Sequence, residues 1–277
     1  MRAQIIFGLI LAVPIAVLLY LIFGPALQRR RRRKLRALPP PAGLEAVLER
    51  NVPLYRSMPE DLRRQLLAHA NVFLAEKNFI GCGGQEITDE IRFTVAGTAC
   101  ALLLNREPEY FPGFTSILIY PDTFESMDVQ YDGQVEVHER TARAGESWHR
   151  GPVVLSWGDV IRGVIDPVDG FNVVLHEFAH KLDEQDSGTD GLPELHALDH
   201  YEEWAEVLSR EYEALAERAA RGTNHVLDDY GLESPAEFFA VATESFFESA
   251  KAMKKRLPDL YEQLRRYYRV DPATWDR

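Results

Sequence analysis

The chain has 277 residues, enough to form one large domain or two small ones around a substantial core. The first 41 residues contain eight basic side chains and no acidic one, so residues 42–277 carry 23 bases against 43 acids, a net charge of about −20. A surface with that charge repels phosphate backbones, which excludes nucleic acid as an expected partner.

The N-terminal part of the sequence predicts a membrane anchor. Residues Ile5–Leu27 are all uncharged and mostly apolar, and a helix of that length crosses a bilayer with some tilt. The basic run Arg29–Arg36 follows, and bases beside a span mark its cytoplasmic side; they could also bind anionic lipid headgroups. We therefore expect residues 1–28 to be a transmembrane helix in the inner (cytoplasmic) membrane and residues 29–42 a basic, proline-rich linker. Residues 43–277 are then a domain that faces the cytoplasm.

Apolar spacing and turn residues predict the elements that follow. Ser57 and Glu60 match a capping box, which predicts a helix from there to about residue 75. Further helices are expected over residues 89–104, 171–184, about 196–220, 235–250 and 258–268, and strands over residues 116–120, 135–138 and 153–157. An Asp132-Gly133 turn predicts a hairpin that begins near Val129. Strands come first and helices later, so we expect an α+β fold that is mostly helical with a small β-sheet.

The two cysteines, Cys82 and Cys100, are too few for a disulfide framework. Cys100 lies in an apolar run that reads as the buried face of a helix. We expect it to be a buried free thiol, as suits a reducing compartment.

Residues 176–180 read His-Glu-Phe-Ala-His. On a helix, His176 and His180 share one face and can offer two imidazole nitrogens to one metal ion, while Glu177 lies about 100° round the helix, able to take a proton from a metal-activated water. Apolar residues surround the motif, so the helix is expected to be buried. Burying these polar groups without partners costs several kcal/mol. Bound zinc removes that cost; the alternative is two core histidines bonded to carbonyl groups.

A catalytic zinc needs a third protein ligand and an open position for water. Glu237 and Glu244 lie seven residues apart, on one face of a predicted apolar helix. Glu237 also completes a capping box with Ser234, and Pro235 stands at the first helical position. Spacing alone does not choose between the two glutamates as the ligand.

Two separated motifs resemble the Mlc titration factor A (MtfA) family. They are the run Asn172–Asp183 around the histidine motif, and the run Ser234–Val241 with Tyr230 before it. The resemblance extends over most of residues 45–275. Members are zincin-like zinc peptidases of the gluzincin type, with a catalytic core similar to that of anthrax lethal factor.

The resemblance implies a role for each candidate residue. His176, His180 and Glu237 become the zinc ligands, and Glu177 becomes the general base. Tyr230 could donate a hydrogen bond to the oxyanion of the tetrahedral intermediate, or be an ordinary half-buried tyrosine.

One position departs from the pattern of many gluzincins. The acid that bonds a zinc-bound histidine in those enzymes is replaced here by Val241. The resemblance leaves Glu244 among the groups around the ligands, but Asp183, Glu244 or a backbone carbonyl could substitute for that acid, and the sequence does not say which.

The expected function is therefore a membrane-anchored zinc peptidase that acts on a peptide or protein substrate. The resemblance implies an aminopeptidase-like activity, for which Glu244 or Glu184 could recognise the substrate amine. The alternative is a binding module that sequesters a transcriptional regulator at the membrane. A purely structural zinc site is disfavoured, because such sites usually have four protein ligands, often thiolates, and neither cysteine is near the motif.

Overall fold

The structure is a computed structural model of the chain. It describes residues 18–19, 21, 23–122, 124–132, 135–143, 145–147, 151–166, 169–186, 188, 190–195, 197–198, 200–223 and 226–275. The chain divides into two compact units, Met1–Pro39 and Pro40–Arg277.

The first unit corrects the expectation of a membrane anchor. Residues 23–36 are helical, but the second half of this stretch is the basic run. Within the described ranges, no helix has both the length and the apolar character that a bilayer crossing requires. The predicted transmembrane helix at residues 1–28 is therefore wrong, and so is the single-pass placement in the inner membrane. Most of the run Ile5–Leu27 lies outside the described residues.

The second unit contains a four-stranded sheet whose order is β1-β2-β6-β5. The strands are β1 Asn78–Gly81, β2 Ser116–Tyr120, β6 Val153–Ser156 and β5 Gly145–Ser147. The first three are parallel, and β5 is antiparallel to β6 at the edge. All of β6 is buried. A continuous apolar strand of this kind is typical of a sheet that is covered on both faces.

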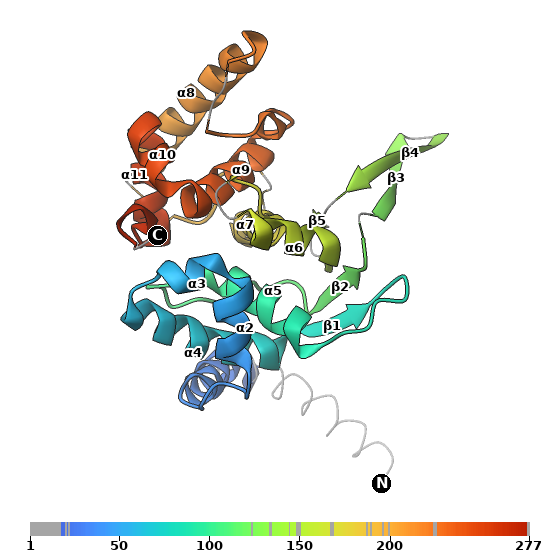
Figure 1. The fold of residues 1–277 in the computed structure, drawn as a ribbon, viewed down its shortest axis with the longest axis vertical. Coiled ribbons are helices and arrows are strands. Elements are labelled where there is room, and N and C mark those ends of the chain that lie inside the picture. Colours follow the sequence, from blue (N-terminus) through green and yellow to red (C-terminus); the bar gives the residue numbers. More distant parts are fainter. Residues whose placement is uncertain are drawn as a thin grey trace, which may run out of the picture. The chain divides into compact units, whose positions relative to one another are not determined.

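Helices make up most of the same unit (Figure 1). They are α2 Leu44–Asn51, α3 Pro53–Ser57, α4 Glu60–Glu76, α5 Asp89–Ala101, α6 Trp157–Ile165, α7 Val173–Asp183, α8 His200–Ala220, α9 Pro235–Glu248, α10 Ala250–Arg256 and α11 Pro258–Tyr268, with the 3-10 turns η1 Glu184–Asp186, η2 Asp229–Leu232 and η3 Pro272–Thr274. This content agrees with the α+β class, and within this unit each predicted helix and strand is present with its ends moved by a few residues. Cys100 is a buried free thiol on α5, as expected.

Two local predictions were wrong. Ser57 does not cap α4: it ends α3 and its hydroxyl donates to the Leu54 carbonyl, while Pro59 precedes α4. Trp157 does not end a strand, because Ser156 caps a new helix there by accepting a hydrogen bond from the Asp159 amide at 3.2 Å. Both serines form short-range bonds with backbone groups, Ser57 within the helix that it ends and Ser156 at the start of the next helix, and such bonds compete with the predicted element ends.

A separate hairpin is formed by β3 Phe124–Asp132 and β4 Val135–Arg143, which pair antiparallel. Its backbone confirms the predicted hairpin, but the first strand begins at Phe124 rather than near Val129. Residues 133–134, at the predicted turn, lie outside the described part of the chain.

Helix α7 contacts α5, α6, α9, β5 and β6. Its Phe178 is fully buried, and the ring contacts Phe73, Phe111 and Phe114 with centroid separations of 5.6, 4.8 and 6.0 Å. Phe178 lies between the two histidines in sequence and therefore points away from their face. The aromatic cluster fixes α7 from one side and leaves the histidine face directed towards α9.

A loop after α7 connects three helices through Gly191. The Gly191 amide donates to Asp183 Oδ2 at 2.9 Å, and its carbonyl accepts from Trp204 Nε1 at 3.4 Å. Its backbone has a left-handed φ of 78° and lies directly against the Pro235 carbonyl, at the start of α9. The end of α7 and the start of α9 are therefore joined through a position that has no room for a side chain.

Replacing Gly191 tests this junction. An added Cβ would lie 2.4 Å from the Pro235 carbonyl oxygen, so Gly191→Ala combines a steric clash with an unfavourable φ. We expect a loss of roughly 2–4 kcal/mol in the free energy of unfolding, measured by urea denaturation. The matched control is Gly222→Ala, where φ is 62° but nothing lies within 4 Å; it should cost roughly 1 kcal/mol. Equal losses in the two variants would contradict a steric role for Gly191.

Candidate metal centre

Side-chain caps begin both helices that build the site. Asn172 Oδ1 accepts a hydrogen bond from the Leu175 amide at 3.1 Å at the start of α7, and Ser234 Oγ accepts from the Glu237 amide at 3.2 Å at the start of α9. The capping interpretation of the Ser234–Glu237 pair is thus partly right. The cap fixes the backbone of Glu237 while its carboxylate points at the histidines of α7.

The structure brings the three predicted ligands together from α7 and α9. His176 Nε2 lies 2.9 Å from Glu237 Oε2, and His180 Nε2 lies 3.3 Å from the same oxygen. The two Nε2 atoms are 3.2 Å apart. His180 is buried, whereas His176 and Glu237 are partly exposed. Of the residues with described side chains, these three form a group whose donor atoms could all reach one ion.

These separations fit a divalent cation with tetrahedral coordination. Zinc bonds of 2.0–2.1 Å place neighbouring ligand atoms roughly 3.3 Å apart, close to all three observed separations. Two imidazoles and one carboxylate are also a donor set that zinc accepts in catalytic sites, with a fourth position left for water or substrate. The residues therefore fit zinc, although their role as ligands stays a prediction.

Glu244 orients His176. Its Oε1 accepts a hydrogen bond from His176 Nδ1 at 2.7 Å, and its Oε2 accepts one from the Asn172 amide. Because Nδ1 is held in this way, Nε2 is directed towards Glu237 and His180. The sequence left three candidates for this role, and the geometry selects Glu244: Asp183 binds the Gly191 amide instead. Val241 is buried and apolar at the position where many gluzincins have an acid.

Among the described residues, the second histidine has no equivalent orienting group. His180 Nδ1 is buried and has no hydrogen-bond partner in the part of the chain that the structure describes. The two imidazoles are therefore held differently, His176 by Glu244 and His180 by the packing of α7.

The electrostatics of the site couple His176 to two carboxylates. Burial lowers the pKa of the His176 imidazole, but the charge of Glu244 and the hydrogen bonds with Glu237 and Glu244 outweigh it and raise that pKa well above its usual value. Burial raises the pKa of the Glu237 carboxyl, but hydrogen bonds from both histidines hold it well below its usual range. Without a metal, a protonated His176 would therefore donate to Glu244 through Nδ1 and to Glu237 through Nε2.

The remaining predicted residues are close by. Glu177 is buried, and its charge acts on the pKa of His176. Tyr230 is 46% exposed, and its ring centroid lies 5.7 Å from that of His176. Glu184 forms an ion pair with the buried Lys181 at 2.9 Å. The catalytic roles of Glu177 and Tyr230 stay predictions.

Asn172 is a positioning residue that the sequence reasoning missed. Its side chain caps α7 and also donates to Glu248 Oε1 at 2.8 Å, while its backbone amide binds Glu244. An asparagine just before an apolar helix is a recognisable capping signal, so the first of these contacts could have been predicted. The other two depend on where α9 packs, which the local sequence does not contain.

A buried His-Glu-x-x-His helix faced by a glutamate is the arrangement of a metallopeptidase-like protein. The family model described as glucose-regulated metallo-peptidase M90 matches residues 26–269, and the chain belongs to this family. The uncharacterized protein slr2042 of Synechocystis sp. is 36% identical over 267 residues, which cover 96% of this chain and 97% of that protein.

Two relatives share a name. The proteins named Mlc titration factor A of Pectobacterium atrosepticum and Yersinia pestis are 32% and 31% identical over 232 and 230 residues, 81% of this chain and 85% and 83% of theirs. The resemblance to the MtfA family is confirmed.

Metal uptake should depend on pH because of His176. A metal ion must displace the proton that the two carboxylates stabilise, so protons compete whenever the pH is below the raised pKa of His176. As the pH is lowered, we expect the zinc affinity of the metal-free protein to fall by up to about tenfold per pH unit. This fall should begin above pH 6.5, the ordinary pKa of histidine, because the pKa of His176 is raised. Competition with a calibrated chelator between pH 6 and 9 measures this. An affinity that does not change over that range would show that His176 loses no proton when the metal binds.

Proposed function

We propose that the chain is a zinc-dependent peptidase whose ligands are His176, His180 and Glu237. The observation that supports this most directly is the triangle of donor atoms on α7 and α9, with edges of 2.9, 3.2 and 3.3 Å. Membership of a metallo-peptidase family supports the same reaction class. The substrate is then a peptide or protein.

The proposed chemistry divides between the ion and the chain. Zinc held by these ligands would polarise the scissile carbonyl and lower the pKa of a water molecule towards 7. Glu177 accepts the proton from the attacking water and passes it to the leaving amine. It follows His176 on α7, so both are fixed by the same buried helix. Glu244 and Asn172 take no part in proton transfer and keep His176 in position.

Tyr230 is proposed to assist at the oxyanion. It lies in η2, which packs against α9, and its exposed ring stands beside His176. The phenol is a hydrogen-bond donor, as an oxyanion requires.

The carboxylates suggested for recognising a substrate amine, Glu244 and Glu184, are engaged by His176 and Lys181. We therefore propose peptidase activity without assigning it to the amino end of the substrate.

Glu177→Gln tests the general base. The variant keeps the size of the side chain and all three ligands, so the zinc content should be unchanged. Loss of proton transfer should lower kcat for a hydrolysed peptide by about 10²–10⁴-fold. Glu206→Gln is the control, since it removes an exposed acid from α8 and should have wild-type activity. A fully active Glu177→Gln protein would remove Glu177 from the mechanism.

Binding of a transcriptional regulator is a second candidate function. The observation that favours it is the name of two relatives, which describes titration of Mlc. Residues 42–277 carry a net charge of about −20, which would attract a basic surface of such a partner. This function does not require a metal.

A metal-free variant separates the two functions. His176→Ala with His180→Ala should abolish zinc binding and hydrolysis. If the regulator binds elsewhere on the surface, the double variant should form a complex with purified Mlc as tightly as the wild type does, measured by light scattering on a sizing column. Failure of both proteins to bind Mlc would count against this function and leave the peptidase proposal untouched.

A further inference from the structure

A surface pocket of about 390 Å³ lies between α8, the start of α9 and the loop that contains Gly191. Its volume is within the range of natural small-molecule pockets. Three of its lining residues, Ala205, Ser209 and Pro235, are exposed, so the pocket opens to solvent. The hydrocarbon of its walls comes from Leu192, Trp204, Leu208, Tyr212, Pro235 and Phe238.

The aromatic side chains of this pocket are held by the protein itself. Trp204 Nε1 donates a hydrogen bond to the Gly191 carbonyl at 3.4 Å, and the Tyr212 hydroxyl donates to the Leu232 carbonyl at 2.8 Å. The Tyr212 ring also packs edge-on against Phe238, with the ring centroids 5.6 Å apart. These walls are therefore fixed before a ligand arrives, and they offer hydrocarbon and ring surface rather than hydrogen-bond donors.

The charge of the lining is negative. The described residues that line the pocket include two acids, Asp190 and Glu213, and no base. In the part of the chain that the structure describes, neither carboxylate has an ion-pair partner; Asp190 Oδ1 accepts a hydrogen bond from the Leu192 amide at 3.2 Å. Two carboxylates that the protein's own bases do not neutralise favour a cationic ligand.

Helix α8 adds to this negative potential. It contains six acids and two arginines, a net charge of −4 with histidine counted as neutral. Arg210 pairs with Asp259 at 2.7 Å and with Glu211 at 3.4 Å, and Arg218 lies 3.8 Å from Glu211. The positive charges of the helix are thus engaged by acids that do not line the pocket.

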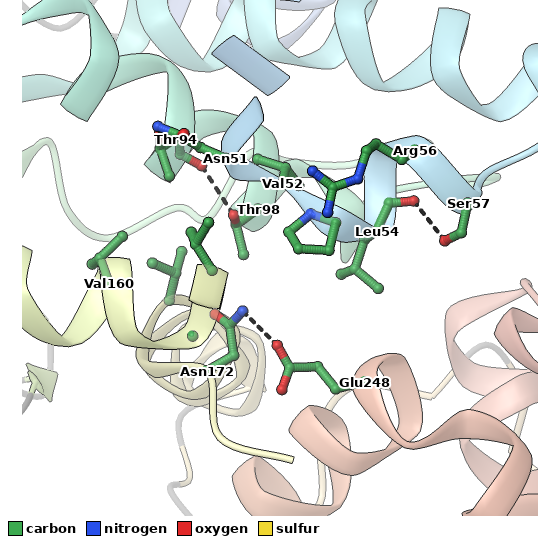
Figure 2. A pocket seen from close by; sticks show the side chains of 14 residues that line it. Asn51, Val52, Leu54, Arg56, Ser57, Thr94, Thr98, Val160, Asn172 and Glu248 are labelled. Carbon is green, nitrogen blue, oxygen red and sulfur yellow. Dashed lines mark hydrogen bonds between the residues drawn. The ribbon is translucent and has the colours of Figure 1, made fainter. Parts of the chain in front are cut away.

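A second cavity of similar size lacks this bias. It has a volume of about 340 Å³ and lies beside Asn172, where Arg56 and Glu248 both contribute to its lining (Figure 2). These two charges have opposite signs, so the lining does not select a cation there. By contrast, the pocket beside α8 combines apolar walls with charge of one sign.

An arginine side chain matches this combination. Its aliphatic stem can cover the apolar wall, while its planar guanidinium group donates hydrogen bonds to carboxylates and lies favourably against aromatic rings. A free small cation would satisfy the same groups. However, the net charge of about −20 on residues 42–277 extends well beyond the pocket and favours a larger basic surface, such as that of a protein.

We propose that the pocket beside α8 binds an arginine side chain on an exposed basic segment of a partner protein. The guanidinium group pairs with Asp190 and Glu213, and the stem covers the apolar wall. This binding needs no metal and does not rest on the proposed peptidase activity. It goes beyond attraction of a basic partner by overall charge, because it assigns the contact to one pocket.

A labelled peptide tests the charge requirement. The probe is a short fluorescein-labelled peptide of alternating arginine and leucine. Its matched control replaces each arginine by citrulline, which has nearly the same shape and no charge. The protein is the full chain with Glu177→Gln, which should not cleave the probe. By fluorescence anisotropy at low salt, the arginine peptide should bind about tenfold more tightly than the citrulline peptide. Equal affinity for the two peptides, or no binding of the arginine peptide, overturns the proposal.

Variants of the lining locate the peptide. Asp190→Asn with Glu213→Gln keeps the size of both side chains and the acceptor for the Leu192 amide. It should weaken binding of the arginine peptide by about tenfold, to the level of the citrulline peptide. Ser209→Phe fills the pocket from an exposed position and should weaken binding as much. Ser209→Leu is a milder second choice if that variant does not fold.

The matched control removes the same charge elsewhere. Glu86→Gln with Glu107→Gln neutralises two exposed acids that do not line the pocket, and this variant should bind the arginine peptide as the wild-type pocket does. Unchanged binding in both the charge-removing and the pocket-filling variants would overturn the proposal. An equal loss in the control variant would also overturn it, because attraction would then depend on overall charge alone.

A metal-free variant separates this pocket from the metal centre. His176→Ala with His180→Ala lacks two proposed zinc ligands but keeps the pocket, so it should bind the arginine peptide as tightly as the Glu177→Gln protein does. Loss of binding in this variant, with retention in Ser209→Phe, would place the peptide at the metal centre and overturn the proposal. A protein that binds the peptide in the pocket but hydrolyses no substrate would refute the peptidase proposal and leave the pocket assignment standing.

Discussion

The arrangement depends on His176 being held between two carboxylates of one neighbouring helix. Glu244 binds Nδ1 and Glu237 faces Nε2, so this imidazole fixes the rotation of α7 relative to α9 as well as its own orientation. Desolvating this largely enclosed imidazole costs free energy, and the two acids offset the cost only while both helices stay in register. The caps at Asn172 and Ser234 maintain that register by fixing where each helix begins.

The two faces of helix α7 have different surroundings. Phe178 enters a cluster of aromatic rings, and the histidines face α9. Phe178 and Val174 are four residues apart and share one face of the helix, and the two histidines share the opposite face, so a short motif supplies both directions. The aromatic cluster around Phe178 holds α7 in place, and the opposite face presents the two histidines to Glu237.

The local sequence contained the elements, the two histidines and the two acids Glu237 and Glu244, because a four-residue histidine spacing and an apolar helix with acids are short-range patterns. The choice of Glu237 as the third ligand came from the resemblance to the MtfA family. It did not contain the contacts of Asn172 with Glu244 and Glu248, which exist only once α9 has packed against α7. The membrane prediction rested on apolar composition over residues 5–27 alone. The described helix at residues 23–36 is instead short and half basic, so it does not meet the requirements of a membrane span. Choosing Glu244 over Asp183 likewise required knowing that Asp183 is engaged by Gly191.

His176 and Glu237 are separated by 61 positions along the chain, and all of α8 lies between them. An ion bound by both residues would be a reversible cross-link that closes this long loop. Like a disulfide, it would reduce the conformational freedom of the chain between the two residues. Part of the free energy of metal binding would then stabilise the α8 segment against unfolding. Metal supply would in this way set the lifetime of the protein against cellular proteases as well as its activity.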